Sequence, residues 1–148
     1  MEKDHGGIIG GNFSFRPRDR RFRRLFDEAV SRPPSKIPKI TTLRAISLSR
    51  RPAGNTVGLT RYSETRYFLI LTRPEQTITF YLALLNALSD PAATAVIAHE
   101  LAHAWLNEHV RPEESGKRER EADVLAREWG FGPELDALDS EAETVNSD

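Results

Sequence analysis

The segment AVIAHELAHAWLNEH, residues 95–109, places two histidines and a glutamate where they could bind and use a metal ion. His99 and His103 are four residues apart, which on an α-helix is about 40° of rotation and about 6 Å of rise. Two imidazoles at that offset can bind one cation, and zinc suits neutral imidazole. Glu100 lies about 100° round the helix from His99, so its carboxylate can accept a proton from an activated water without binding the metal. The HExxH pattern therefore predicts a zinc site with Glu100 as catalytic base.

The composition of the surrounding helix supports this interpretation. Most neighbours of the three residues are apolar, namely Val96, Ile97, Leu101, Ala102, Ala104, Trp105 and Leu106. We therefore expect this helix to be largely buried. A buried pair of histidines beside a carboxylate needs a partner that offsets the loss of hydration, and a metal ion provides one. The chain has no cysteine, so the ligands must be His, Asp or Glu.

Two histidines and a water molecule leave one position for a third protein ligand, and His109 is one candidate. It follows His103 by six residues, as in the pattern HExxHxxGxxH, but Leu106 stands where that pattern has glycine. On a continuous helix His109 would lie about 15 Å along the axis from His99, too far to share a metal. Its alternative role is that of an exposed residue which, when protonated, favours the C-terminal end of the helix dipole.

The other candidate ligand lies in EREAD, residues 119–123. Glu119 and Asp123 are one turn apart on a predicted helix over 117–129, and a short loop would pack that helix antiparallel to the first. Glu119 could then complete the ligand set, and Asp123 could accept the N–H of a ligand histidine and fix its tautomer. A solvated helix face is the alternative for these acids, but we favour Glu119 over His109 as third ligand.

The remaining elements must position these residues. The pattern of apolar residues predicts an amphipathic helix over 18–31, which the prolines that follow bring to an end. Three β-like runs follow at 39–49, 56–62 and 66–72, the last two flanking SET as a hairpin and the last apolar enough to be a covered central strand. We expect Asp90 to cap the metal-binding helix and Gly130 to cap the helix over 117–129.

Composition and length limit the possible classes of protein. A chain of 148 residues with 39% hydrophobic and 29% charged residues suits one globular domain. We expect a flexible arm at 1–17, a single domain at 18–138 and an acidic flexible tail at 139–148. No apolar run approaches the roughly 20 residues that would span a bilayer, and the N-terminus does not resemble a secretory signal. We therefore expect a cytoplasmic protein with no membrane insertion; the sequence defines no oligomeric state.

Charge is distributed unevenly, although the net charge is -1. Basic residues concentrate in 16–51 and acidic residues in 108–148. Solvated basic and acidic faces explain this arrangement more simply than a nucleic-acid surface does. Nucleic acid is therefore a partner that we do not favour.

Two segments, LALLNALSDPAATAVIAHELAHAWL and EREADVLA, resemble the gluzincin metallopeptidases. More narrowly, they resemble the soluble catalytic core of the CAAX-prenyl-protease and heat-shock membrane endopeptidase family, and the stand-alone minigluzincins. The resemblance covers about residues 78–127. It implies that His99, His103 and Glu119 bind zinc, that Glu100 is general base and acid, and that Asp123 orients a ligand histidine.

The resemblance also implies a fold and a substrate. The expected fold is α+β: a small zincin-like domain in which a short mixed or antiparallel sheet packs on the HExxH helix and on an antiparallel, glutamate-bearing helix. In related zinc peptidases an edge strand above the active-site helix binds peptide in extended form. TVGLTRY, residues 56–62, is the candidate for that strand, and backbone pairing would give little sequence preference.

The chain also departs from the family pattern. It lacks the membrane helices of the family, so the family's prenylated membrane substrate is not expected for this chain. No histidine follows His109 to hold the oxyanion of the reaction, and weak support for that charge would mean low activity. The residues that could take over this role are Arg118, Arg120, Tyr62, Tyr67 and Tyr81.

Three functions remain open. The first is a small zinc endopeptidase that cleaves peptides or unfolded proteins by means of a metal-activated water and a glutamate base. The second is a zinc-stabilised binding or regulatory module with little or no turnover. The third is a DNA-associated HExxH protease whose basic stretch at 16–24 contacts phosphates.

Overall fold

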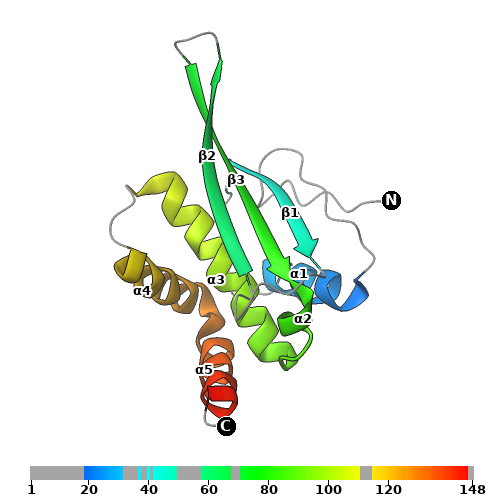
Figure 1. Ribbon diagram of the computed structural model, residues 1–148. Helices are drawn as coiled ribbons and strands as arrows, with labels where there is room; N and C mark the ends of the chain where they lie inside the picture. The colour runs from blue at the N-terminus through cyan, green and yellow to red at the C-terminus, as the bar shows by residue number, and fades with distance from the viewer. Residues whose placement is uncertain are drawn as a thin grey trace.

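A three-stranded sheet lies against a long central helix in the computed structural model, which describes residues 19–31, 37, 40, 42–49, 58–67, 71–110 and 115–146 (Figure 1). The predicted arm at 1–17 lies outside these residues. Along the chain the elements are α1 (Arg20–Ser31), β1 (Leu43–Ser49), β2 (Gly58–Tyr67), β3 (Leu71–Tyr81), α2 (Leu82–Leu85), α3 (Asp90–His109), α4 (Ser115–Ala126), the π-helical turn η1 (Arg127–Phe131) and α5 (Gly132–Asn146).

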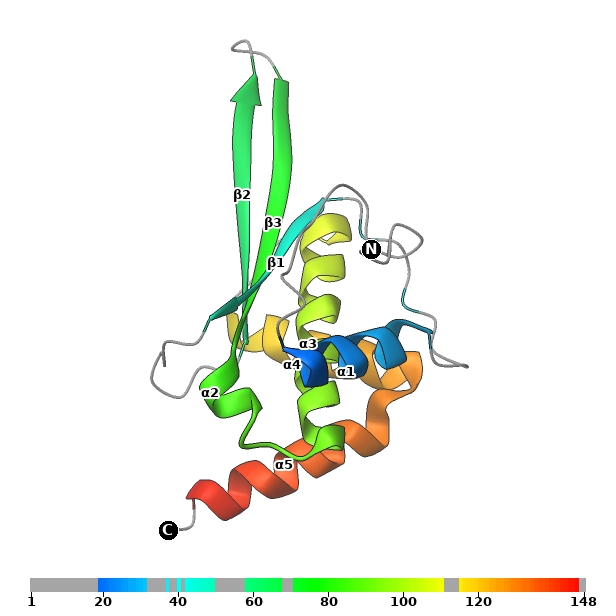
Figure 2. The same cartoon turned by 90° about the vertical axis from the view of Figure 1, so that its right-hand side faces the viewer.

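The fold is mixed α+β, with more helix than strand among the described residues. In the sheet the strand order is β1-β3-β2; β1 runs parallel to β3 and β2 runs antiparallel to it. A purely antiparallel sheet is therefore excluded. Figures 1 and 2 show β2 and β3 continuing together beyond β1 as a long ribbon that projects from the body of the molecule.

The hairpin prediction was wrong about where the strands end. SET, residues 63–65, lies inside β2, and β3 continues to Tyr81 instead of ending near residue 72. The covered central strand is β3, whose Ile78 and Phe80 are fully buried. Pro74 does not stop β3. Among the described strands, β1 pairs with β3 only from Gln76 onward, so the stretch around Pro74 pairs with β2 alone, and a strand paired on one side tolerates proline.

Helix α1 forms as predicted and covers part of the core. Its buried residues are Phe22, Leu25, Phe26 and Ala29. Asp19 precedes the helix, and its carboxylate accepts a hydrogen bond from the backbone N–H of Phe22 at 2.8 Å, which satisfies one of the unpaired N–H groups at the helix start. The apolar face packs toward α3, and the Phe22 ring contacts that of Phe80 in the sheet.

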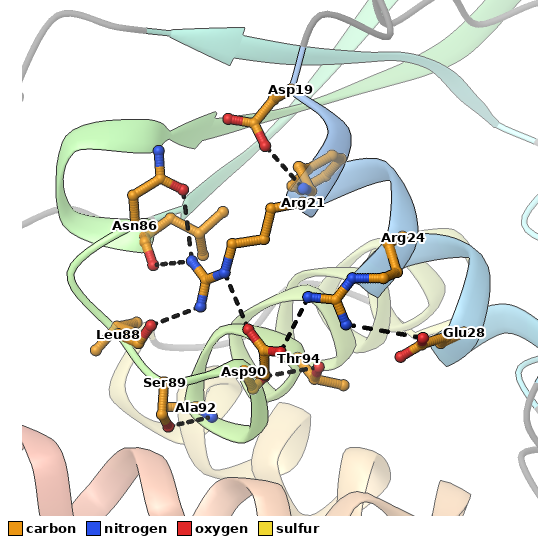
Figure 3. Close-up of polar contacts among 12 residues, drawn as sticks. Asp19, Arg21, Arg24, Glu28, Asn86, Leu88, Ser89, Asp90, Ala92 and Thr94 are labelled. Atoms are coloured by element: carbon orange, nitrogen blue, oxygen red, sulfur yellow. Dashed lines mark hydrogen bonds and ion pairs between the residues drawn. The ribbon is translucent and has the colours of Figure 1, made fainter.

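The start of α3 is held from two directions (Figure 3). Its N-cap is Ser89 instead of the predicted Asp90, and the Ser89 hydroxyl accepts from the backbone N–H of Ala92. Asp90 instead pairs with Arg21 and Arg24 of α1, at 3.0 Å in each case. These ion pairs attach α1 to the first turn of α3, where a carboxylate also complements the helix dipole.

The chain after α4 bends at Gly130 and continues as α5, which crosses the start of α3 (Figure 2). Gly130 has φ = 99°, a left-handed conformation that suits glycine, as the predicted helix cap requires. Helix α5 then packs on α3, and Glu141 accepts hydrogen bonds from the backbone N–H and hydroxyl of Ser89. The helix runs to Asn146, past residue 139 where the sequence predicts the acidic tail to begin.

Acid should weaken the attachment of α1 to α3. The hydrogen bond from Arg24, followed by that from Arg21, holds the pKa of Asp90 below its usual value of 3.8. A depressed folded-state pKa contributes stability above the usual value, and that stability is lost as pH falls through the folded-state pKa. As pH falls from about 5 to about 3, the free energy of unfolding of the metal-free wild type should decrease more than that of Asp90→Asn. Urea unfolding measures both. Arg24→Gln should flatten the same pH dependence; parallel curves for all three proteins would contradict this assignment.

The bend at Gly130 should be sensitive to a side chain. Gly130→Ala should lower the free energy of unfolding by about 1–2 kcal/mol, because an L-residue is strained at that φ. Gly132 is the matched control: it has helical φ/ψ, and an added Cβ would meet only the flexible end of Arg127 at 3.8 Å. Gly132→Ala should therefore keep or slightly raise stability. Equal unfolding free energies for both variants in urea would show that the bend carries no such strain.

Candidate functional site

Helix α3 presents two histidines side by side on its one polar strip. His99 and His103 are one turn apart, and their ring centroids are 4.6 Å apart with the ring planes at 81°. Their side chains are 16% and 12% exposed. Most of the other residues of α3 are buried against the sheet, α1, α4 and α5. The imidazoles therefore lie at an opening in an otherwise covered helix.

Helix α4 brings two carboxylates to these histidines. The two oxygens of Glu119 lie 3.0 Å from Nε2 of His99 and 2.9 Å from Nε2 of His103. Asp123, one turn further along α4, has Oδ1 2.7 Å from Nδ1 of His99. The helices α3 and α4 pack together, so residues 16 and 20 positions apart in the chain become direct neighbours.

The contacts of His99 assign its proton. An ionised carboxylate can only accept hydrogen bonds, so Nδ1 of His99 carries the proton that Asp123 accepts. In a neutral ring Nε2 is then an acceptor, and it faces a second acceptor on Glu119. Two acceptors at 3.0 Å repel one another unless a proton or a cation lies between them.

This donor set fits a divalent metal ion. One atom each from His99, His103 and Glu119 can be chosen so that all three lie within 4.8 Å of one another. Two imidazole nitrogens and a carboxylate oxygen are ligands that zinc and similar ions accept, and they leave a position for water or substrate. A cation would also relieve the facing acceptors on His99 and Glu119. The residues present therefore match what a catalytic metal site requires.

The site is exposed to solvent on the side formed by α4. The Glu119 side chain is 64% exposed, and that of Asp123 is 49% exposed. Glu100, next to His99 on α3, is by contrast 7% exposed. A reactant can approach the histidines past Glu119, while the glutamate of the HExxH pattern sits in a drier environment. Low exposure strengthens electrostatic interactions at that carboxylate.

The alternative third ligand, His109, lies elsewhere. Its ring stacks on that of Trp105, with centroids 4.3 Å apart, and its Nδ1 lies 3.0 Å from the Trp105 carbonyl oxygen. It is not part of the group formed by His99, His103 and Glu119.

Sequence reasoning missed a buried amide next to the site. Gln76 of β3 is 0% exposed, and its side chain donates to the backbone carbonyl of Ala104, the residue after His103. One signal was available. Gln76 precedes the alternating pattern of Ile78 and Phe80 at the same spacing, so it occupies a core position of the strand with a polar side chain.

Arg118 was a candidate for holding the oxyanion, and the structure places it in other contacts. Its guanidinium is buried, donates to the carbonyl of Val110 at 3.3 Å and lies 3.5 Å from Glu121. The hydrogen bond to Val110 joins the end of α3 to the start of α4, and the pair with Glu121 lies within α4. Among the described residues, no helix is both long enough and apolar enough to cross a membrane.

The comparisons with known proteins agree with this geometry. Residues 42–117, more than half of the chain, match the model of Peptidase family M48. The match includes the sheet, the HExxH segment and α3, and it ends two residues before Glu119. Curated proteins and solved structures yielded no match. The chain therefore belongs to peptidase family M48, whose members are metal-dependent peptidases.

Proposed function

We propose that the protein is a zinc-dependent endopeptidase that cleaves peptides or unfolded proteins. The observation that carries the proposal is the convergence of ligand atoms of His99, His103 and Glu119 from two helices. Glu100, the residue after His99, is buried. The family supports a metallopeptidase, and the donor set supports zinc. In this assignment the two histidines and Glu119 hold the metal, as the gluzincin resemblance implies.

Each residue then has a defined task. Zinc, when bound, supplies a Lewis acid that lowers the pKa of a water molecule and polarises a peptide carbonyl. Glu100 accepts the proton of the attacking water and later delivers it to the leaving amine nitrogen, so it is base and acid in turn. Its low exposure supports this role, because a proton held in a dry site is not readily lost to solvent.

Asp123 positions a ligand histidine in this proposal. The short contact to Nδ1 of His99 fixes the tautomer that leaves Nε2 available to the metal. Asp123 therefore acts through His99 and does not itself touch substrate.

The sheet offers the binding edge. β2 is the outer strand on one side, it pairs only with β3 among the described strands, and it lies against α3. An extended peptide could pair with the open edge of β2 and so run alongside the metal-binding helix. Pairing of this kind uses backbone groups, which favours unfolded proteins over one defined sequence. The predicted edge, residues 56–62, overlaps the first half of β2.

One observation favours the second function, a zinc-stabilised module with little turnover. The metal ligands come from both α3 and α4, so a bound ion would join two helices whatever the activity. The DNA-associated alternative loses support, because Arg21 and Arg24 of the basic stretch are engaged with Asp90.

Metal binding should follow the proposed ligands. The wild-type protein should bind about one zinc ion per chain, and His99→Ala and Glu119→Ala should abolish stoichiometric binding. Asp123→Asn should weaken zinc affinity by about 10–100-fold, because an uncharged amide oxygen is a weaker acceptor for the ligand histidine than a carboxylate. His109→Ala is the control and should bind zinc like the wild type. Elemental analysis and competition with a chromogenic chelator measure both quantities, and wild-type protein without zinc would refute the assignment.

Catalysis should depend on Glu100, whereas zinc binding should not. Glu100→Gln should keep its zinc and lower kcat/KM on an unfolded fluorogenic protein substrate by about 10²–10⁴-fold, since the amide cannot accept the proton of water. Glu108→Gln, two turns further along α3, is the matched control. A Glu100→Gln protein that hydrolyses at the wild-type rate would exclude the proposed base. A zinc-loaded wild type that cleaves nothing would favour the binding module.

A further inference from the structure

A buried amide, the side chain of Gln76, joins the sheet to the metal-binding helix. Gln76 of β3 is 0% exposed, and its Nε2 donates to Thr42 Oγ1 and to the Ala104 carbonyl oxygen, at 2.8 Å each. Its Oε1 accepts from Nδ2 of Asn107 at 3.2 Å. The side chain thus uses both of its N–H groups and its oxygen inside the protein. A buried amide with these partners is held in one orientation.

On the sheet side, Gln76 lies where the three strands meet. It pairs with Leu43 of β1 and, on its other side, with Tyr62 of β2. Its own backbone N–H also donates to the carbonyl of Thr42 at 2.9 Å. Between Gln76 and Leu71, β3 pairs with β2 but not with β1. Gln76 therefore marks the point at which the projecting ribbon leaves the three-stranded sheet.

On the helix side, the partners of Gln76 follow the metal-binding residues directly. Ala104 is the residue after His103, and Asn107 is one turn beyond His103 on α3. A side chain that bonds both of these positions resists sliding or rotation of α3 against β3. An apolar side chain at position 76 would fill the same space without opposing a shift along the helix axis, because apolar contacts are non-directional.

We propose that Gln76 is a positioning residue which sets the register between edge strand β2 and the catalytic residues of α3. The inference rests on the proposed function, in which a peptide pairs with β2 and is cleaved beside Glu100. β2 is held by its backbone pairing with β3, in which Gln76 pairs with Tyr62, and the side chain of Gln76 joins the same strand to α3. A bound peptide is thereby held at a defined height above His103 and Glu100.

The kinetic test uses Gln76→Met, which keeps the length of the side chain and removes its hydrogen bonds. A displacement of about 1 Å between substrate and catalytic groups can cost up to 100-fold in rate. We expect kcat per zinc-loaded molecule to fall by about 10-fold or more while KM changes by less than about twofold, because pairing with β2 persists. Asn107→Ala, which leaves both Nε2 bonds intact, should give a smaller loss of kcat in the same direction.

Ile46→Ala controls for a general loss of stability. Ile46 is fully buried in β1, and its substitution should destabilise the fold but leave kcat per zinc-loaded molecule unchanged. A Gln76→Met protein with wild-type kcat per zinc-loaded molecule would overturn the proposal, and so would an equal loss in Ile46→Ala.

A second measurement does not require activity. The chain has no cysteine, so spin labels attach only where a cysteine is introduced, here at Arg61 of β2 and His109 of α3. Pulsed electron paramagnetic resonance should give one narrow distance distribution with Gln76 present and a shifted or broader one in Gln76→Met. An unchanged distribution would overturn the proposal even if kcat fell. If the wild type cleaves nothing, the proposed function fails, and the distance distribution still decides whether Gln76 sets the register.

Discussion

A helix that is apolar on nearly every side is stable only when other elements cover it, and α3 is such a helix. The sheet covers one side, α1 packs at its first half, and α4 and α5 cover the remainder. The polar groups that α3 must keep are confined to its start, its end and the strip that carries His99 and His103. Because α3 cannot leave these neighbours without exposing apolar surface, the two histidines stay on this strip, where α4 supplies the described side chains that contact them.

The predictable part of the site was the part that depends on helical periodicity alone. His99 and His103 lie four residues apart, as do Glu119 and Asp123, so each pair shares a face whatever the tertiary structure is. The short connection between the helices favoured an antiparallel arrangement, and in the structure Glu119 contacts both histidines and Asp123 contacts His99. Their roles as metal ligand and positioning residue stay predictions. The strand pattern places Gln76 at a core position, but its partners Thr42, Ala104 and Asn107 come from other parts of the chain, so the alternation alone does not reveal its role.

The sheet was harder to predict because strand ends depend on neighbouring strands. Pro74 reads as a break, yet β3 passes through it where, among the described strands, it pairs with β2 alone. SET reads as a turn, yet it lies within β2 because pairing with β3 continues on both sides. The α3 cap was displaced by one residue because the carboxylate of Asp90 pairs with arginines of α1 that are far away in sequence.

The bend at Gly130 divides residues 115–146 into two helical segments with different tolerances for change in length. The first segment, α4, carries Glu119 and Asp123 in phase, and each residue inserted between them would turn one away from the other by about 100°. The second segment, α5, needs only to reach Ser89 with Glu141 near its far end. Insertions and deletions between Glu119 and Asp123 are therefore incompatible with the site, whereas the helix beyond Glu141 can lengthen or shorten without altering it.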